Sequence, residues 1–225
     1  MAWTPLPEVV EMTVETPQPK EVQLDPKKSA LVIVDMENYF CKTDMEGRSH
    51  AVIDGNVTLL EKAREAGAKV IYVQSVRQLE SPNHTVYKRA RNLLIGTWNT
   101  EIVEEIAPIP GEHVVQKWSH DVWAWYGLED VLAKEGITED EYTVLVTGVS
   151  AAQCANAAAL GFANRHYDVL IPLDTTAASV EAEARTYAHY MGAGYDYNIG
   201  FTTSQMVSFV PQEAEPVPAE MIPAV

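Results

Sequence analysis

Short runs of consecutive apolar residues alternate along the chain with longer segments whose apolar positions recur at helical spacing. The apolar runs are expected to form buried strands at residues 30–34, 69–74, 113–117, 143–147, 168–172 and 198–202. The segments between them are expected to form helices at 54–67, 99–106, 126–136, 152–165 and 179–193. Gly67 and Gly136 fall where two of these helices should stop. The alternation predicts a three-layer α/β fold with a doubly wound, mainly parallel six-stranded sheet, a Rossmann-like architecture.

The two ends of the chain depart from this pattern. Residues 1–27 hold prolines and charges without a helical period and predict an extended arm, residues 28–210 predict one domain, and residues 211–225 predict a tail. No apolar run approaches the ~18 residues of a membrane span, and the first residues lack the basic and apolar regions of a secretory signal. Two cysteines do not make a disulfide framework, so we expect a reducing cytoplasm.

The charge of the chain limits the partners that we expect. A formal net charge of −16 argues against nucleic acid, which is bound by basic surfaces. It would also modestly repel anionic substrates, although salt screens this repulsion beyond ~10 Å. The composition therefore favours a small, neutral or amide-bearing substrate, unless a basic group in the pocket overrides it.

At or just after the ends of three predicted strands lie residues that could take part in catalysis or binding. Asp35 ends a fully apolar run, where an unpaired carboxylate would be costly. Lys117 ends the short β-like run at 113–117, and Cys154 lies within a turn of a helix start, just past the run at 143–147. Open α/β sheets bind ligands at this edge, and a helix start favours a thiolate. A buried, inert cysteine is the alternative for Cys154 taken alone.

In these motifs the chain resembles the isochorismatase-like cysteine hydrolases. This group includes nicotinamidases, N-carbamoylsarcosine amidase, biuret hydrolase and ureidoacrylate amidohydrolase. The resemblance spans about residues 28–210 and is carried by an ordered set of segments: VIVDM at 32–36, LIGTWNTEIV at 94–103, VVQK at 114–117, TGVSAAQC at 147–154 and YDVLIPLD at 167–174.

The resemblance implies a catalytic triad of Asp35, Lys117 and Cys154. Cys154 would be the nucleophile, Asp35 the acid and base, and Lys117 the cation that favours the ionised forms of both. It also implies an oxyanion hole formed by the amides of Ser150 and Cys154, with a cis peptide bond before Ser150. The chain departs from many relatives at Ala151-Ala152, where these have Thr-Asn or Thr-Asp, so the subfamily is harder to name.

No metal or other cofactor is expected. Nicotinamidases carry an Asp-x-His pair with a further histidine after the second strand, whereas this region holds only His84. Metal sites need clustered ligands, so we disfavour a nicotinamidase.

Several side chains are candidates for substrate binding because they follow strands or the triad residues closely. For the aromatic ones, packing in the core or at a subunit interface is the alternative, and for Arg77 it is a solvated surface. The candidates are Tyr39, Phe40, Arg77, Trp118, Trp123 and Gln205.

The function that we expect is metal-independent hydrolysis of a C–N bond in a small amide, ureide or carbamoyl compound, through a thioester on Cys154. An isochorismatase-type vinyl-ether hydrolase and a non-catalytic family member are the alternatives. Retention of the cysteine argues against the first, and retention of all three triad positions against the second. The resemblance also implies a homodimer or homotetramer.

Overall fold

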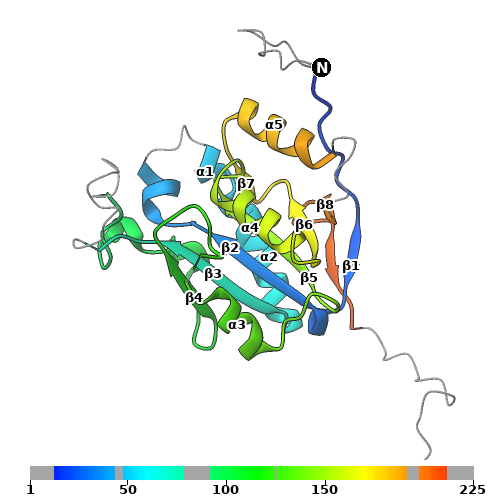
Figure 1. The fold of residues 1–225 in the computed structure, drawn as a ribbon, viewed down its shortest axis with the longest axis horizontal. Helices are drawn as coiled ribbons and strands as arrows, with labels where there is room; N and C mark the ends of the chain where they lie inside the picture. The colour runs from blue at the N-terminus through cyan, green and yellow to red at the C-terminus, as the bar shows by residue number, and fades with distance from the viewer. Residues whose placement is uncertain (1–12, 44–47, 79–91, 125, 192–197, 212–225) are drawn as a thin grey trace, which may run out of the picture.

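Six parallel strands form the centre of the molecule, in the order β4-β3-β2-β5-β6-β8 (Figure 1). The computed structural model describes residues 13–43, 48–78, 92–124, 126–191 and 198–211. The six strands are β2 (Ser29–Val34), β3 (Lys69–Ser75), β4 (His113–Lys117), β5 (Thr143–Val149), β6 (Asp168–Pro172) and β8 (Ile199–Thr202). They confirm the six expected strands. A seventh, β7 (Thr176–Ala177), pairs with β5 and is too short to be read from an apolar pattern.

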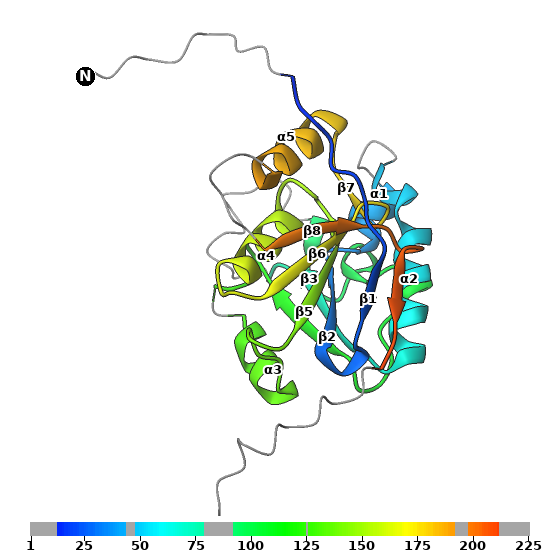
Figure 2. The same cartoon turned by 90° about the vertical axis from the view of Figure 1, so that its right-hand side faces the viewer.

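Helices cover both faces of this sheet (Figure 2). Helix α2 (Ile53–Ala66) lies on one face, and α3 (Leu128–Glu135), α4 (Cys154–Ala163) and α5 (Val180–Met191) lie toward the other. As expected, α2 and α3 end at Gly67 and Gly136, both in the left-handed conformation. The three-layer fold predicted from the alternation is therefore confirmed.

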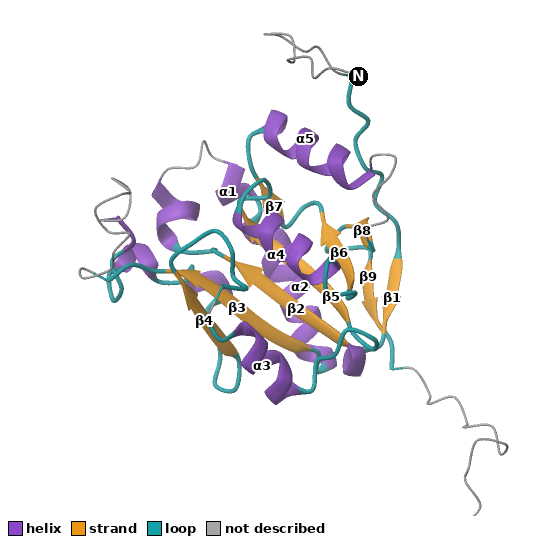
Figure 3. Ribbon diagram, in the orientation of Figure 1, coloured by secondary structure: helices purple, strands orange, loops and turns teal. Residues whose placement is uncertain are grey.

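Shorter helical turns fill the connections (Figure 3). They are η1 (Pro26–Lys28), the π-helix η2 (Tyr39–Thr43), α1 (Arg48–Ala51), η4 (Trp98–Thr100) and η5 (Glu104–Ile106). The last two occupy the segment where one short helix was expected. Within the described residues, no helix is both long and apolar enough to cross a membrane.

Strand β2 explains why its sequence is continuously apolar. All six of its residues are buried. Ala30, Val32 and Val34 pack into the cluster that includes residues of α3, α4 and α5. Leu31 and Ile33 point to the opposite side and pack with residues of α2. A strand that is covered on both faces carries apolar residues at every position, which is the pattern of buried parallel sheets.

The strand order reverses between β2 and β5. From β2 the chain proceeds outward through β3 and β4, then returns to β5 on the other side of β2. Val34 is in register with Gly148, whose φ is 92°. A Cβ atom at Gly148 would lie only 1.9 Å from the carbonyl oxygen of Val34, so only glycine allows this approach. The reversal creates the position where open α/β sheets bind their ligands.

A second, two-stranded sheet joins the predicted N-terminal arm to the end of the domain. Strands β1 (Val22–Leu24) and β9 (Val207–Phe209) pair in parallel. Lys62 of α2 donates to the carbonyl of Val207 and thereby fixes β9 on the helix. These strands were not predicted, because each has only three residues and depends on a partner distant in the sequence. The predicted tail lies almost entirely outside the described residues.

Candidate active site

The ends of three neighbouring strands bring together the first part of the site. Asp35 follows β2, Ser75 ends β3 and Lys117 ends β4. Ser75 and Lys117 are register partners, and the amide of Asp35 donates to the carbonyl of Val73 at 2.8 Å. Asp35 has a φ of 51°, which is unusual for a residue other than glycine. The backbone turns out of β2 there, at the edge of the sheet where all three side chains meet.

Asp35 and Lys117 form a fully buried ion pair. The ammonium of Lys117 lies 2.7 Å from Oδ2 of Asp35 and donates to the hydroxyl of Ser75 at 2.9 Å. Ser75 in turn donates to the same carboxylate oxygen at 3.0 Å. Burial by itself would lower the pKa of Lys117, but the charge of Asp35 and the hydrogen bond to its carboxylate outweigh burial, so this pKa is raised. Lys117 therefore remains a cation.

Cys154 is the first residue of α4, and its side chain is buried close to this pair. Burial raises the pKa of the Cys154 thiol well above its usual value. The charge of Asp35 raises it further, whereas Lys117 lowers it. The sequence predicted that the helix start would favour a thiolate. In the structure desolvation wins, so Cys154 rests as a thiol and must lose its proton during the reaction.

One oxygen of Asp35 is available for that proton. Oδ2 is occupied by Lys117 and Ser75. Oδ1 is buried and accepts no hydrogen bond from any described residue. A buried carboxylate oxygen without a donor is costly, and it is relieved when the oxygen binds a proton. The arrangement can therefore move a proton between the thiol and Asp35.

The turn between β5 and α4 presents two unused amide groups. The peptide bond between Val149 and Ser150 is cis, as the family resemblance implied. The amide of Ala151 donates to Ala177 of β7 at 2.8 Å, which supports the turn. Among the described residues, the amides of Ser150 and Cys154 have no hydrogen-bond acceptor. Free N–H groups at a helix start are suited to an anion.

Glu37, which the sequence analysis did not select, is a second buried carboxyl at the site. Its Oε1 accepts a hydrogen bond from the amide of Ser75, while Oε2 has no partner among the described residues. Burial, followed by the charge of Asp35, raises the pKa of Glu37 well above its usual value. Burial and the neighbouring carboxylate therefore favour the protonated, neutral form of Glu37.

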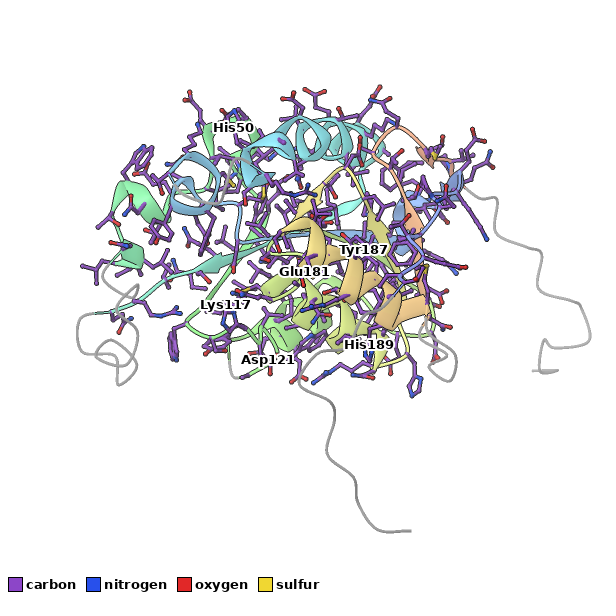
Figure 4. All side chains as sticks on the ribbon, turned by 90° about the horizontal axis from the view of Figure 1, so that it is seen from above. His50, Lys117, Asp121, Glu181, Tyr187 and His189 are labelled. Carbon is purple, nitrogen blue, oxygen red and sulfur yellow. The ribbon has the colours of Figure 1, made fainter. Side chains whose placement is uncertain are left out.

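His120 also contacts the cysteine, and the sequence reasoning did not select it. Its Nδ1 lies 3.2 Å from Sγ of Cys154. His120 is exposed and comes from the loop between β4 and α3, which begins after Lys117 and includes Asp121, both labelled in Figure 4. The only signal in the sequence was its position three residues after Lys117, and a histidine at that spacing is not a recognised motif.

Three of the predicted substrate-binding residues are aromatic and follow Asp35 or Lys117 closely along the chain. Tyr39 and Phe40 begin η2, directly after the turn that carries Asp35, and their rings contact each other edge to face at 5.3 Å. Trp118 follows Lys117, is 40% exposed and packs edge to face on Tyr126 at 4.9 Å. These partly exposed aromatic rings remain candidates for the wall of a substrate pocket.

Two others, Arg77 and Gln205, take part in hydrogen bonds with residues outside the triad. Arg77 donates to the carbonyl of its neighbour Val76 at 2.7 Å. Gln205 is exposed, and its carbonyl accepts from Lys62 of α2 at 3.2 Å.

Trp123 packs behind α4 instead of facing the site. Its indole lies over Gly161, where a Cβ atom would be 1.9 Å from Nε1, and contacts Phe162 edge to face at 4.7 Å. The guanidinium of Arg165 lies 3.9 Å above the ring. The indole thus fills a notch on α4 that exists because Gly161 has no side chain. The sequence did not indicate this contact, because Gly161 is distant from Trp123 along the chain.

No three histidine, cysteine, aspartate or glutamate side chains gather as metal ligands within the described part of the chain. His84, the histidine weighed as a ligand, lies outside the described residues. The expectation that no metal takes part stays a prediction.

Comparison with known proteins identifies the family and agrees with the fold. The Isochorismatase domain model matches residues 29–196. N-carbamoylsarcosine amidase from Thermoplasma acidophilum is similar in structure, with a TM-score of 0.67 and 24% identity over 79% of this chain and 96% of that one. A cysteine hydrolase from Pseudomonas syringae pv. phaseolicola 1448A has a TM-score of 0.70 and 20% identity, over 88% of this chain and 95% of that one. Nicotinamidase from Bacillus subtilis has a TM-score of 0.66 and 17% identity, over 78% of this chain and 99% of that one. The chain belongs to the isochorismatase family.

Proposed function

We propose that this protein is a cysteine hydrolase that cleaves a C–N bond of a small amide, ureide or carbamoyl compound. The observation that carries the proposal is the buried Asp35–Lys117 pair beside the thiol of Cys154, at the start of α4. A buried ion pair contributes little to stability compared with apolar packing, so its presence beside a nucleophile suggests a catalytic use.

In the first half of the reaction, Sγ of Cys154 attacks the substrate carbonyl carbon while the thiol proton passes to Oδ1 of Asp35. The S–C bond forms, and the carbonyl becomes a tetrahedral oxyanion. When the C–N bond breaks, Asp35 returns the proton to the leaving nitrogen, so that ammonia or an amine departs and a thioester remains. Hydrolysis of the thioester releases the acid and restores the thiol.

Two features support stabilisation of the oxyanion. The free amides of Ser150 and Cys154 can donate to it, and fixed donors of this kind contribute roughly 3–4 kcal/mol each in other hydrolases. Lys117 keeps its positive charge throughout because of its raised pKa and offsets the negative charge that develops nearby. Glu37, as a neutral acid, adds no negative charge that would oppose the oxyanion.

The substrate class rests on charge and on the relatives. A net charge of −16 disfavours anionic substrates. Two structural relatives are amidases by name, acting on N-carbamoylsarcosine and on nicotinamide. We propose a small molecule with an amide or ureido group, turned over without a cofactor, by a homodimer or homotetramer in the cytoplasm.

The test is ammonia release from a panel of primary amides, ureides and carbamoyl amino acids. The wild type and Cys41→Ser should release ammonia from the same compounds, whereas Cys154→Ser should not. The two variants carry the same chemical change at the two buried cysteines and therefore control for each other. Hydrolysis of a vinyl ether that survives in Cys154→Ser, with no ammonia from any amide, would favour the acid-only alternative and contradict the proposal.

A further inference from the structure

The loop between β4 and α3 places an imidazole against the proposed nucleophile. Asp35 and Lys117 reach Cys154 from the ends of strands and are buried, with exposures of 1% and 0%. His120 reaches the same sulfur from a loop and is exposed, with Nδ1 at 3.2 Å from Sγ. The thiol thus lies between a buried carboxylate and a histidine that is open to solvent.

The loop is anchored on both sides of His120. Before it, the ammonium of Lys117 donates to the carbonyl of Ser119 at 3.1 Å. The hydroxyl of Ser119 donates to the carbonyl of Asp121 at 2.9 Å, which closes a turn around His120. After it, the amide of Trp123 donates to Oδ1 of Asp121 at 2.9 Å. The backbone of His120 is therefore held between two fixed neighbours.

The second anchor leads to the helix that carries the nucleophile. The indole of Trp123 fills the notch above Gly161 of α4 and packs on Phe162. Cys154 is the first residue of the same helix. One rigid element therefore carries the thiol at its start and holds the loop of His120 two turns later. The contact between His120 and Cys154 is a consequence of this packing and not of an unrestrained surface side chain.

The chemistry of the second half-reaction leaves a role for such a group. Water must reach the thioester from the solvent side, lose a proton and deliver one to the departing sulfur. Asp35 lies on the buried side, where Lys117 and Ser75 already occupy one of its oxygens. Imidazole can accept and donate a proton near neutral pH, and Nδ1 of His120 is already within hydrogen-bonding distance of the sulfur that must be reprotonated.

We propose that His120 is a further catalytic residue, the general base and acid for hydrolysis of the Cys154 thioester. Nδ1 takes a proton from the water whose oxygen attacks the thioester carbonyl carbon. The C–S bond then breaks, and the proton passes from Nδ1 to Sγ, so that one water is consumed and the acid and the free thiol are formed. This assignment rests on the proposed function, because it presupposes a thioester.

The experiment compares formation and loss of the acyl-enzyme in the wild type and in His120→Ala, with His50→Ala as the matched control. His50 is an exposed histidine on α1, in a different part of the fold. Rapid-quench mass spectrometry follows the thioester, and ammonia release gives the first turnover and the steady state. His120→Ala should form the thioester in a burst, accumulate it and turn over at least about tenfold more slowly. Free imidazole should restore turnover, because the position is open to solvent.

Each other outcome has a defined meaning. Steady-state turnover within twofold of the wild type, or equal loss in both half-reactions without rescue by imidazole, would overturn the role of His120. Faster turnover in His120→Ala would show that the ring only covers the thiol, and would overturn it as well. Absence of any thioester and of ammonia in the wild type would contradict the proposed function itself, which separates the two failures.

Discussion

The two cysteines of the chain are both buried, and burial is the main reason that the pKa of each thiol is raised. Cys41 is 4% exposed, and burial raises its pKa to about 12. Its sulfur lies 3.8 Å from the sulfur of Met36, within an apolar cluster. Cys154 has a raised pKa too, yet it lies beside Asp35, Lys117 and His120.

The comparison shows that the acidity of the resting thiol does not distinguish the two sites. What differs is the presence of groups that can take the proton and stabilise charge while the bond forms. Near Cys41 the charge of Glu105 opposes a thiolate, and Lys42, which favours a thiolate, is on the surface paired with Glu105. Cys154 has a buried cation and two proton acceptors.

The largest expected effect comes from removing the cation. Lys117→Met leaves Asp35 charged and buried without its partner, which should lower the free energy of unfolding by about 3–5 kcal/mol and abolish activity. Denaturant unfolding and ammonia release measure the two effects. The double variant Asp35→Asn/Lys117→Met should recover much of the stability but none of the activity. Recovery of activity in the double variant would contradict the role of the pair.

Exchanging either sulfur should give opposite results at the two cysteines. Cys154→Ser should reduce turnover by more than about 10³-fold with a small change in stability, since a poorer nucleophile remains. Cys41→Ser should leave turnover within twofold but lower the free energy of unfolding by about 1–3 kcal/mol, because it buries a hydroxyl without a partner. Equal loss of activity in both variants would remove the distinction between the sites.

Disturbing the notch that holds the loop of His120 should have an intermediate effect. Gly161→Ala introduces a Cβ atom that would lie 1.9 Å from the indole of Trp123, and overpacking of this kind costs about 1–3 kcal/mol. Displacement of the loop should slow steady-state turnover, with the thioester accumulating as in His120→Ala. Gly161→Ala/Trp123→Leu removes the clash and should regain stability without regaining turnover. Unchanged kinetics in both variants would show that the packing of Trp123 over Gly161 does not position His120 for catalysis.

The smallest effect concerns the second carboxyl. The folded-state pKa of Glu37 is raised by burial and by Asp35, whereas an unfolded glutamate titrates near 4.3. The protonated form is therefore the stable one in the fold, and stability is lost as pH rises above the unfolded value toward the folded one. Glu37→Gln keeps a neutral side chain at every pH. The melting temperature of this variant, relative to that of the wild type, should increase from pH 5 to pH 8. A difference in melting temperature that stays the same across this pH range would contradict a neutral Glu37.

Much of the fold follows from the sequence because its central strands are covered on both faces. The six apolar runs could be read as strands without knowing their partners. Strands β1, β7 and β9 and the π-helix η2 have two to five residues each, and their stability depends on pairing and packing with distant segments. Local patterns therefore carry little information about them.

The same distinction applies to the site. Asp35, Lys117 and Cys154 follow strands, and the structure brings them together. Ser75, the last residue of β3, follows the same rule and could have been selected by it. His120 reaches the thiol only because Trp123 packs over Gly161, a long-range contact that no local pattern encodes. Without knowledge of this contact, the sequence placed Trp123 among the candidates for substrate binding.

The most direct test of the account is to locate the acyl group. A substrate that releases ammonia is mixed with the wild type, Cys41→Ser and Cys154→Ser, quenched in acid and analysed by peptide mass spectrometry. The account predicts an acyl adduct on the peptide that contains Cys154 in the first two proteins and none in the third. Ammonia release with no adduct on that peptide, or an adduct on Cys41, would contradict it.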